Sequence, residues 1–158
     1  MGFRIGFSKD IHRLVQGRKL ILGGIVIPFD KGEQAHSDGD VLLHAIAESI
    51  LGALALNDLG TNFPDNDPKY KDISSVLILK EVKKMMEDEG YSIVNIDASI
   101  ALEKPKLQSY IEDICDNVAD ILDIESSKVS IKAMTNEGMG EVGKGEAVEA
   151  YAITLLSK

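Results

Sequence analysis

Apolar residues recur along this chain with two different periods, and the longer period predicts helices. Spacings of three and four residues predict helices over residues 38–56, 75–89 and 108–122. Ser37 or Asp38 is available to cap the first helix, and Gly90 stops the second. The first of these segments has the most regular pattern.

A period of two residues, or a short apolar run beside a turn signal, predicts the strands. They are expected at 3–7, at 19–29 as a hairpin or bulged pair around Gly23-Gly24, at 92–102, at 128–135 and at 147–156. In the 92–102 strand the even positions from Val94 onward are apolar, so we expect them on one buried face. Segments 30–37 and 57–72 are predicted to be loops.

The order of these elements, β-β-β-α-α-β-α-β-β, decides between fold classes. Strands and helices are interleaved without strict alternation, which favours an α/β (α+β) sandwich with a mixed sheet and helices on one face over a doubly wound sheet. The length of 158 residues suits a single domain, 1–158. Polar residues on the 92–102 strand suggest that the second sheet face packs on another subunit or lines a cavity.

Charge narrows the range of partners. A net charge of −9 disfavours nucleic acid, whose backbone requires clustered Lys and Arg. An anionic small molecule is still compatible if metal ions and a few lysines gather at its site. Apolar runs are too short to span a membrane and the N-terminus shows no signal pattern, so we expect a cytoplasmic protein.

The three histidines all lie in the first third of the chain beside carboxylates. Asp10 and His12 point to one side of a strand, and Asp40, His44 and Glu48 share one helix face. Asp10, His12 and His44 have the residue types of a three-ligand zinc site with an open position, and Asp40 is a candidate partner that orients a ligand. The alternative is that each histidine is only a hydrogen-bonded structural residue. His36 is a candidate acid, base or phosphate donor.

Two segments after predicted strands suit a phosphate, although neither matches a known phosphate-binding fingerprint. They are Glu103-Lys104-Pro105-Lys106 and the glycine-rich Thr135–Gly140 segment. A solvated loop is the plain alternative for the lysine pair. The Phe63–Pro68 turn, with two carboxylates, is compatible with hydroxyl binding, with a lid, or with a simple Asx-turn.

Short motifs in a fixed order run through the whole chain. They are Asp10-Ile11-His12, Gly23-Gly24 with Pro28, Ala35-His36-Ser37-Asp38-Gly39-Asp40, His44-Ala45, Leu51-Gly52, Phe63-Pro64-Asp65, Pro105-Lys106 and Thr135-Asn136-Glu137. In this combination the chain resembles the 2-C-methyl-D-erythritol 2,4-cyclodiphosphate synthases of the non-mevalonate isoprenoid pathway. The His-Ser-Asp-Gly-Asp run followed by His-Ala is specific to that family, whereas Pro-Lys alone carries little weight.

The resemblance implies a lyase that takes 4-diphosphocytidyl-2-C-methyl-D-erythritol 2-phosphate, joins its 2-phosphate to the β-phosphate of the CDP and releases CMP. It also implies a homotrimer with active sites between subunits, and an isoprenoid diphosphate as a candidate ligand of the central cavity. Zinc would be held by Asp10, His12 and His44, and magnesium or manganese by Glu137. His36 and Thr135 would stabilise the transition state.

The same resemblance implies the substrate contacts. The erythritol phosphate would meet Ser37, Asp58, Leu59, Gly60 and Asp65, and the cytidine would meet Leu102, Glu103, Lys104, Pro105 and Lys106. Further substrate-binding positions are Phe63, Met134, Asn136 and Lys144.

Some positions depart from the family pattern: Ser8-Lys9 before the Asp-x-His motif, Glu48 on the helix, Met134, and Glu141, Val142 and Lys144 late in the chain. Two other functions fit the same residues. One is a metal-dependent phosphoesterase that hydrolyses a nucleotide diphosphate. The other is a trimeric module that binds metal and nucleotide without catalysis.

Overall fold

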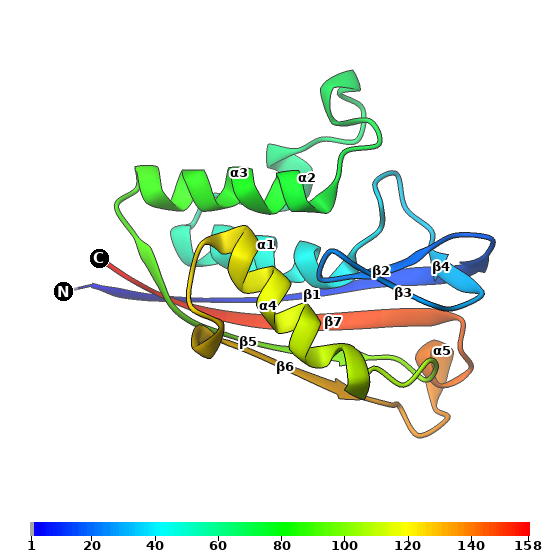
Figure 1. Cartoon of the computed structure of the whole chain (residues 1–158). Coiled ribbons are helices and arrows are strands. Elements are labelled where there is room, and N and C mark those ends of the chain that lie inside the picture. Colours follow the sequence, from blue (N-terminus) through cyan, green and yellow to red (C-terminus); the bar gives the residue numbers. More distant parts are fainter. Residues whose placement is uncertain (1) are drawn as a thin grey trace.

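The two ends of the chain pair with each other to form the centre of the sheet (Figure 1). A computed structural model describes residues 2–158. The five strands are ordered β4-β1-β7-β5-β6. Their bounds are Phe3–Gln16 for β1, Lys31–Glu33 for β4, Ser92–Ala101 for β5, Val129–Met134 for β6 and Ala147–Ser157 for β7. Of these described strands, β5 and β6 pair in parallel and the other neighbours pair antiparallel, so the sheet is mixed, as predicted.

A separate hairpin joins β2, Leu20–Leu22, to β3, Ile25–Ile27. Its turn is Gly23-Gly24, with φ of +61° and +78°. Two successive positive φ values are the geometry of a tight hairpin turn, and glycine adopts them without a steric penalty. The predicted hairpin is therefore confirmed.

The three long helices, α1, α3 and α4, lie on one face of the sheet (Figure 1). Helices α1, α3 and α4 span Val41–Leu54, Ser75–Asp88 and Ile111–Leu122, and two shorter helices, α2 and α5, span Leu59–Asn62 and Gly140–Gly143. Turns of 3₁₀-helix, η1, η2 and η3, cover Pro68–Tyr70, Gln108–Tyr110 and Ser126–Lys128. Among residues 2–158, no helix combines the length and the apolar character needed to cross a membrane.

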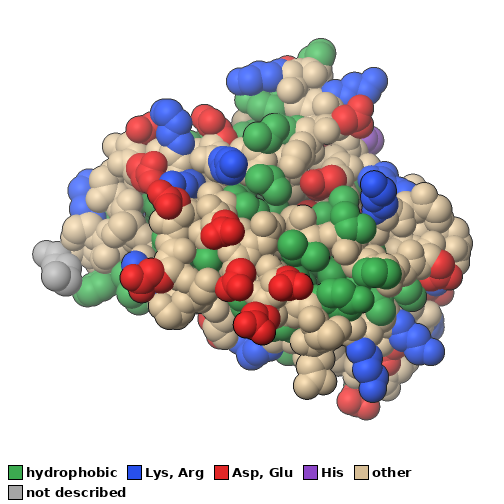
Figure 2. Space-filling view, in the orientation of Figure 1, with side chains coloured by type: hydrophobic (Ala, Val, Ile, Leu, Met, Phe, Trp, Pro, Cys, Tyr) green, Lys and Arg blue, Asp and Glu red, His purple; other side chains and the backbone are tan. Residues whose placement is uncertain are grey.

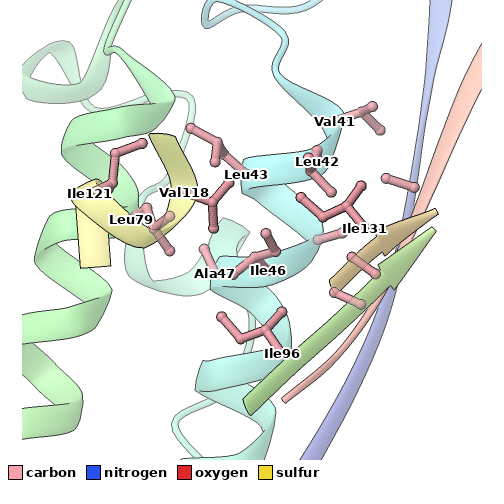
Figure 3. Close-up of a cluster of buried hydrophobic side chains, with 14 of the residues drawn as sticks. Val41, Leu42, Leu43, Ile46, Ala47, Leu79, Ile96, Val118, Ile121 and Ile131 are labelled. Atoms are coloured by element: carbon pink, nitrogen blue, oxygen red, sulfur yellow. The ribbon is translucent and has the colours of Figure 1, made fainter. Parts of the chain in front are cut away.

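Helix α1 is the centre of the core. It lies between the sheet on one side and α3 and α4 on the other (Figure 3). Ile46 of α1 and Ile96 of β5 are completely buried, as are Leu79 of α3 and Val118 of α4. Because apolar neighbours surround α1, nearly every one of its residues is buried, and its few polar side chains need specific partners.

Helix α1 lies very close to the sheet at Gly6 of β1. A Cβ atom at Gly6 would lie 1.8 Å from the carbonyl oxygen of Ser49. Beside it, the Ser49 hydroxyl lies 2.6 Å from the Thr154 hydroxyl, and both residues are completely buried. The missing side chain of Gly6 therefore sets how closely α1 approaches β1 and β7.

The opposite sheet face carries apolar side chains that no described element covers. Phe3, Ile5 and Phe7 of β1 are 60%, 70% and 63% exposed, and Ile11 and Ile153 continue the same surface. On the helical side, by contrast, acidic side chains gather over the region of α4 (Figure 2). An uncovered apolar sheet face of this kind is typical of a surface that another chain covers.

Several details of the predicted fold are wrong. The first strand extends to Gln16, well beyond the predicted 3–7, and the predicted 57–72 loop contains helix α2 and the 3₁₀ turn η1. Segment 30–37 contains the strand β4, which pairs with the end of β1. Helix α1 starts at Val41 and is capped by Asp40, rather than by Ser37 or Asp38. In β5 the register shifts between Ile93 and Asn95, so Ile93 is buried where Val94 was expected.

A carboxyl group is buried in β4. Glu33 is completely buried: its Oε2 accepts a hydrogen bond from the Ile21 amide, while its Oε1 has no hydrogen-bond partner among residues 2–158. Burial, together with the nearby Asp40 carboxyl, raises the pKa of Glu33 to about 9. The folded protein therefore keeps Glu33 protonated at neutral pH.

Replacing Glu33 with glutamine is expected to stabilise the protein, and increasingly so as the pH rises. Above its ordinary pKa of 4.5 the carboxyl ionises in the unfolded chain but stays protonated in the folded one up to about pH 9. The folded state then binds one more proton, so stability falls by about 1.4 kcal/mol per pH unit. The amide of a glutamine cannot ionise, so this part of the slope disappears in Glu33→Gln.

Urea unfolding at pH 6, 7 and 8 in the presence of a chelator measures the difference between the two proteins. A difference that stays constant across this range would mean that Glu33 is ionised in the folded state. Glu81→Gln, on the exposed face of α3, is the matched control.

Candidate metal centre

Two elements bring three ligand types together. Asp10 and His12 lie two residues apart on β1 and point to the side of the sheet that α1 covers, and His44 lies in the first turn of α1. Asp10 Oδ2 is 3.1 Å from His12 Nε2 and 3.3 Å from His44 Nδ1. One ligand atom from each residue lies within 4.8 Å of the other two.

Hydrogen bonds on the far side of each ring fix which nitrogen faces Asp10. His12 Nδ1 is 2.7 Å from the carbonyl oxygen of Gly39, so it must carry the proton. His44 Nε2 is 2.8 Å from the hydroxyl of Ser75. The remaining nitrogens, Nε2 of His12 and Nδ1 of His44, both point at the Asp10 carboxylate.

This convergence fits a divalent cation. In neutral imidazoles the two inward nitrogens offer lone pairs, so three acceptors meet at one point and repel one another unless a proton or a metal lies between them. A tetrahedral zinc ion with bonds of about 2.0 Å separates its ligand atoms by about 3.3 Å, close to the separations found here. One carboxylate and two imidazoles are ligands that zinc prefers.

The charges also favour a cation. Burial opposes ionisation of Asp10, but the neighbouring His12 and His44 rings favour the carboxylate and hold the pKa of this carboxyl well below its usual range. Burial likewise opposes the charged form of His12, while Asp10 raises the pKa of this imidazole above its ordinary value. The carboxylate is thus anionic at neutral pH.

Asp40 does not orient either ligand through its side chain. Its completely buried carboxylate accepts hydrogen bonds from the amides of Gly23, Gly24 and Leu43, so it caps α1 and holds the hairpin turn. Its burial raises its pKa to about 6. The Gly39 carbonyl and Ser75 contact the imidazoles in its place, and the prediction for Asp40 is corrected accordingly.

The metal centre opens into a cavity of about 690 Å³. The predicted residues that line it are Asp10, His12, His36, Ser37, His44, Leu59, Gly60, Phe63 and Asp65. Asp58 is not among the residues that line this cavity. Its carboxylate caps α2 by accepting a hydrogen bond from the Thr61 amide at 2.7 Å. Glu48 also lines the cavity, and its carboxylate holds Ser8 and the Leu59 amide.

An arginine that the sequence analysis did not single out fixes the loop that carries His36. The two terminal nitrogens of the Arg18 guanidinium donate to the carbonyl oxygens of Ala35 and Ser37, each at 3.0 Å. These carbonyls flank His36, whose side chain is exposed at the cavity. The loop is therefore held from behind while its histidine stays free to meet a ligand.

A second cavity of about 250 Å³ lies where strands β5 and β6 end, at the opposite edge of the sheet from β4. The predicted residues that line it are Leu102, Glu103, Pro105, Lys106, Met134 and Thr135. Glu103 also acts on the chain itself, because its carboxylate accepts hydrogen bonds from the amides of Asn136 and Gly138, each at 3.1 Å. It thereby fixes the loop that carries Glu137.

The two cavities of one chain are well separated. The strand register places Asp10, Ala150, Ile100 and Ala133 in one row across four strands. Three strand spacings amount to about 14 Å. Thr135 therefore lies across the sheet from His36. The remaining predicted substrate and metal residues line neither of these two cavities: Lys104, Asn136, Glu137 and Lys144.

Several residues of the first cavity were not predicted. Its wall includes Gln34, Tyr70, Lys71, Asp72, Ile73 and Ile78. Most belong to the 57–74 segment or the start of α3, and Lys71 is the only lysine or arginine among the lining residues of this described cavity. The length of the predicted 57–72 loop was the available signal, since long loops are commonly functional.

Comparison with known proteins identifies relatives over almost the whole chain. The sequence profile of the YgbB family matches residues 3–157. The 2-C-methyl-D-erythritol 2,4-cyclodiphosphate synthase of Clostridium acetobutylicum is 52% identical over 153 residues, covering 97% of this chain and 99% of its own. The synthase of Chloroherpeton thalassium is 51% identical over 155 residues, covering 98% and 99%. A solved 2C-methyl-D-erythritol-2,4-cyclodiphosphate synthase in its CDP-bound form superposes with a TM-score of 0.91 at 33% identity, covering 98% of this chain and 100% of that one.

Proposed function

The chain belongs to the YgbB family, and from this membership and the geometry of its metal centre we propose that it is a cyclodiphosphate synthase of isoprenoid precursor biosynthesis. It converts 4-diphosphocytidyl-2-C-methyl-D-erythritol 2-phosphate to 2-C-methyl-D-erythritol 2,4-cyclodiphosphate and releases CMP. The reaction is an intramolecular phosphoryl transfer in which the 2-phosphate attacks the β-phosphate and CMP is the leaving group.

One observation carries this proposal: the three converging ligands of the metal centre open directly into the cavity that His36 and Ser37 line. Phosphoryl transfer requires mainly positioning and stabilisation of spread negative charge. The attacking group belongs to the same molecule as the phosphate that it attacks. Binding the substrate in a conformation that brings the two groups together therefore accounts for much of the rate enhancement.

Asp10, His12 and His44 are the residues that would hold zinc. When bound, zinc supplies positive charge to the diphosphate and polarises the phosphoryl oxygen. His36, exposed at the cavity mouth on the loop that Arg18 holds, is placed to donate a hydrogen bond to a phosphate oxygen. Asp65 and the α2 segment form the wall that would orient the erythritol hydroxyls.

The second cavity is the proposed cytidine pocket. Its lining includes Leu102, Glu103, Pro105, Lys106 and Thr135. Glu137, exposed on the adjacent loop, would hold magnesium or manganese together with substrate phosphates, the usual mode for a magnesium ion that keeps few protein ligands. Asn136, Met134 and Lys144 belong to the same side of the proposed site.

Asp10 in the first cavity and Ala133 in the second lie three strand spacings apart, about 14 Å. This spacing supports a homotrimer in which the metal centre of one subunit meets the cytidine pocket of the next. The exposed apolar face of the sheet, with Phe3, Ile5 and Phe7, is the surface through which we propose that the trimer forms. An isoprenoid diphosphate is the proposed ligand of the cavity enclosed at the centre of that trimer.

Phosphorus NMR of the reaction tests the function. With the diphosphocytidyl substrate, zinc and magnesium, we expect CMP and a cyclic diphosphate, and with a chelator neither product. Run in ¹⁸O-labelled water, cyclisation leaves the label out of the product, because the attacking oxygen comes from the substrate. Labelled open-chain phosphate would instead identify a hydrolase, and binding without CMP release would identify a non-catalytic module.

A further inference from the structure

Ser75 occupies a position that its sequence context did not indicate. It is the first residue of α3 and is only 1% exposed, at the junction of α3, α1 and the loop that precedes α1. Its hydroxyl lies 2.8 Å from His44 Nε2 and also donates to the Asp38 carboxylate, and its amide donates to the same carboxylate at 3.1 Å. A buried hydroxyl thus connects a metal ligand to an acid.

Counting protons gives this contact a direction. A serine hydroxyl has one proton, and the Asp38 carboxylate can only accept it. The Ser75 oxygen must therefore accept the proton of His44 Nε2. With Nε2 protonated, the lone pair of His44 lies on Nδ1, the nitrogen that faces Asp10 across 3.3 Å.

The other hydroxyl near His44 is a poor substitute. Ser37 Oγ is 3.5 Å from Nε2, and it already accepts a hydrogen bond from the Gly39 amide. The orientation of His12 is fixed instead by the backbone carbonyl of Gly39, which no side-chain substitution removes. His44 is therefore the one histidine of the centre whose orientation depends on a replaceable side chain.

We propose that Ser75 is a positioning residue for the metal centre: with Asp38 behind it, it holds His44 in the Nε2-protonated form and aims Nδ1 at the metal. Outer hydrogen bonds of this kind fix the tautomer and direction of a ligating imidazole. The inference rests on the metal centre of the proposed function, but it concerns metal binding and not cyclisation.

The test compares Ser75→Ala with Ser74→Ala. Ser74 caps the same helix by accepting a hydrogen bond from the Val76 amide at 3.2 Å, and it makes none of the His44 contacts. Zinc affinity is measured by competition with a chelator. We expect Ser75→Ala to weaken zinc binding about 10- to 100-fold and Ser74→Ala to leave it near that of the unmodified protein.

A spectroscopic readout separates orientation from general loosening. In the ¹⁵N-labelled unmodified protein without metal, the Nε2 proton of His44 should give a ring N–H signal because its partner is buried, and Ser75→Ala should lose that signal to exchange with solvent. Equal losses of zinc affinity in both variants, or an unchanged affinity and ring signal in Ser75→Ala, would overturn the proposal. Failed cyclisation by a protein that still binds zinc would count against the proposed function alone.

Discussion

Replacing His44 with alanine is expected to lower the rate of CMP release by about three orders of magnitude. The change removes one of three ligands and leaves Asp10 facing a single imidazole, so zinc is no longer held in the arrangement that neutralises the diphosphate. The loss should appear both as weakened zinc binding and as lost turnover. A phosphorus NMR time course with excess zinc measures the rate.

Two further replacements test the geometry rather than the mere presence of a ligand. The side-chain oxygen of asparagine lies as far from Cβ as Nδ1 of histidine does, whereas the side-chain oxygen of glutamine lies as far as Nε2. Because Nδ1 of His44 faces Asp10, His44→Asn should keep more zinc affinity than His44→Gln. The reverse order would show that His44 binds through its other nitrogen.

Replacing Gly6 with alanine is expected to destabilise the protein by at least about 3 kcal/mol, because overpacking a filled core forces the backbone to move. The added methyl group would lie 1.8 Å from the Ser49 carbonyl oxygen and 2.7 Å from the Ala53 amide nitrogen, both of them backbone atoms of α1. The helix would have to withdraw from β1, breaking the Ser49–Thr154 contact and displacing His44. Urea unfolding measures the loss.

Gly52 on the same helix is the matched control. A Cβ atom there meets nothing within 4 Å, and alanine suits a helix interior better than glycine does. We expect Gly52→Ala to match or exceed the stability of the unmodified protein. If Gly6→Ala unfolds at the same urea concentration as Gly52→Ala, the close contact does not determine the spacing of helix and sheet.

The helices and most strands could be predicted because their patterns are local. The apolar spacing of 38–56 and 75–89 gave α1 and α3 to within a few residues, and Gly90 follows the end of α3 as expected. The histidine and carboxylate pattern also singled out the three residues that converge in the structure, since Asp10 and His12 are two apart on a strand that proved longer than the predicted 3–7. Only the meeting of β1 with α1 was left to tertiary structure.

What could not be predicted depends on contacts between distant segments. Strand β4 has three residues and exists because β1 extends far enough to pair with it, and the burial of Glu33 follows from that pairing. Ser75 is 31 residues from His44. The sequence does not show that, of the two serines at the start of α3, Ser74 caps the helix and Ser75 contacts His44. The site residues carried over from family resemblance remain predictions for experiment.

The burial of nearly all of α1 also bears on how the protein opens. Amide hydrogens exchange with solvent only when their hydrogen bonds break, and the energy of breaking them rises with the packing around the segment. Because α1 lies between two layers, its amides should exchange among the slowest in the molecule, by global unfolding rather than local fraying. His44, on that helix, therefore keeps its place while the edges of the structure open and close.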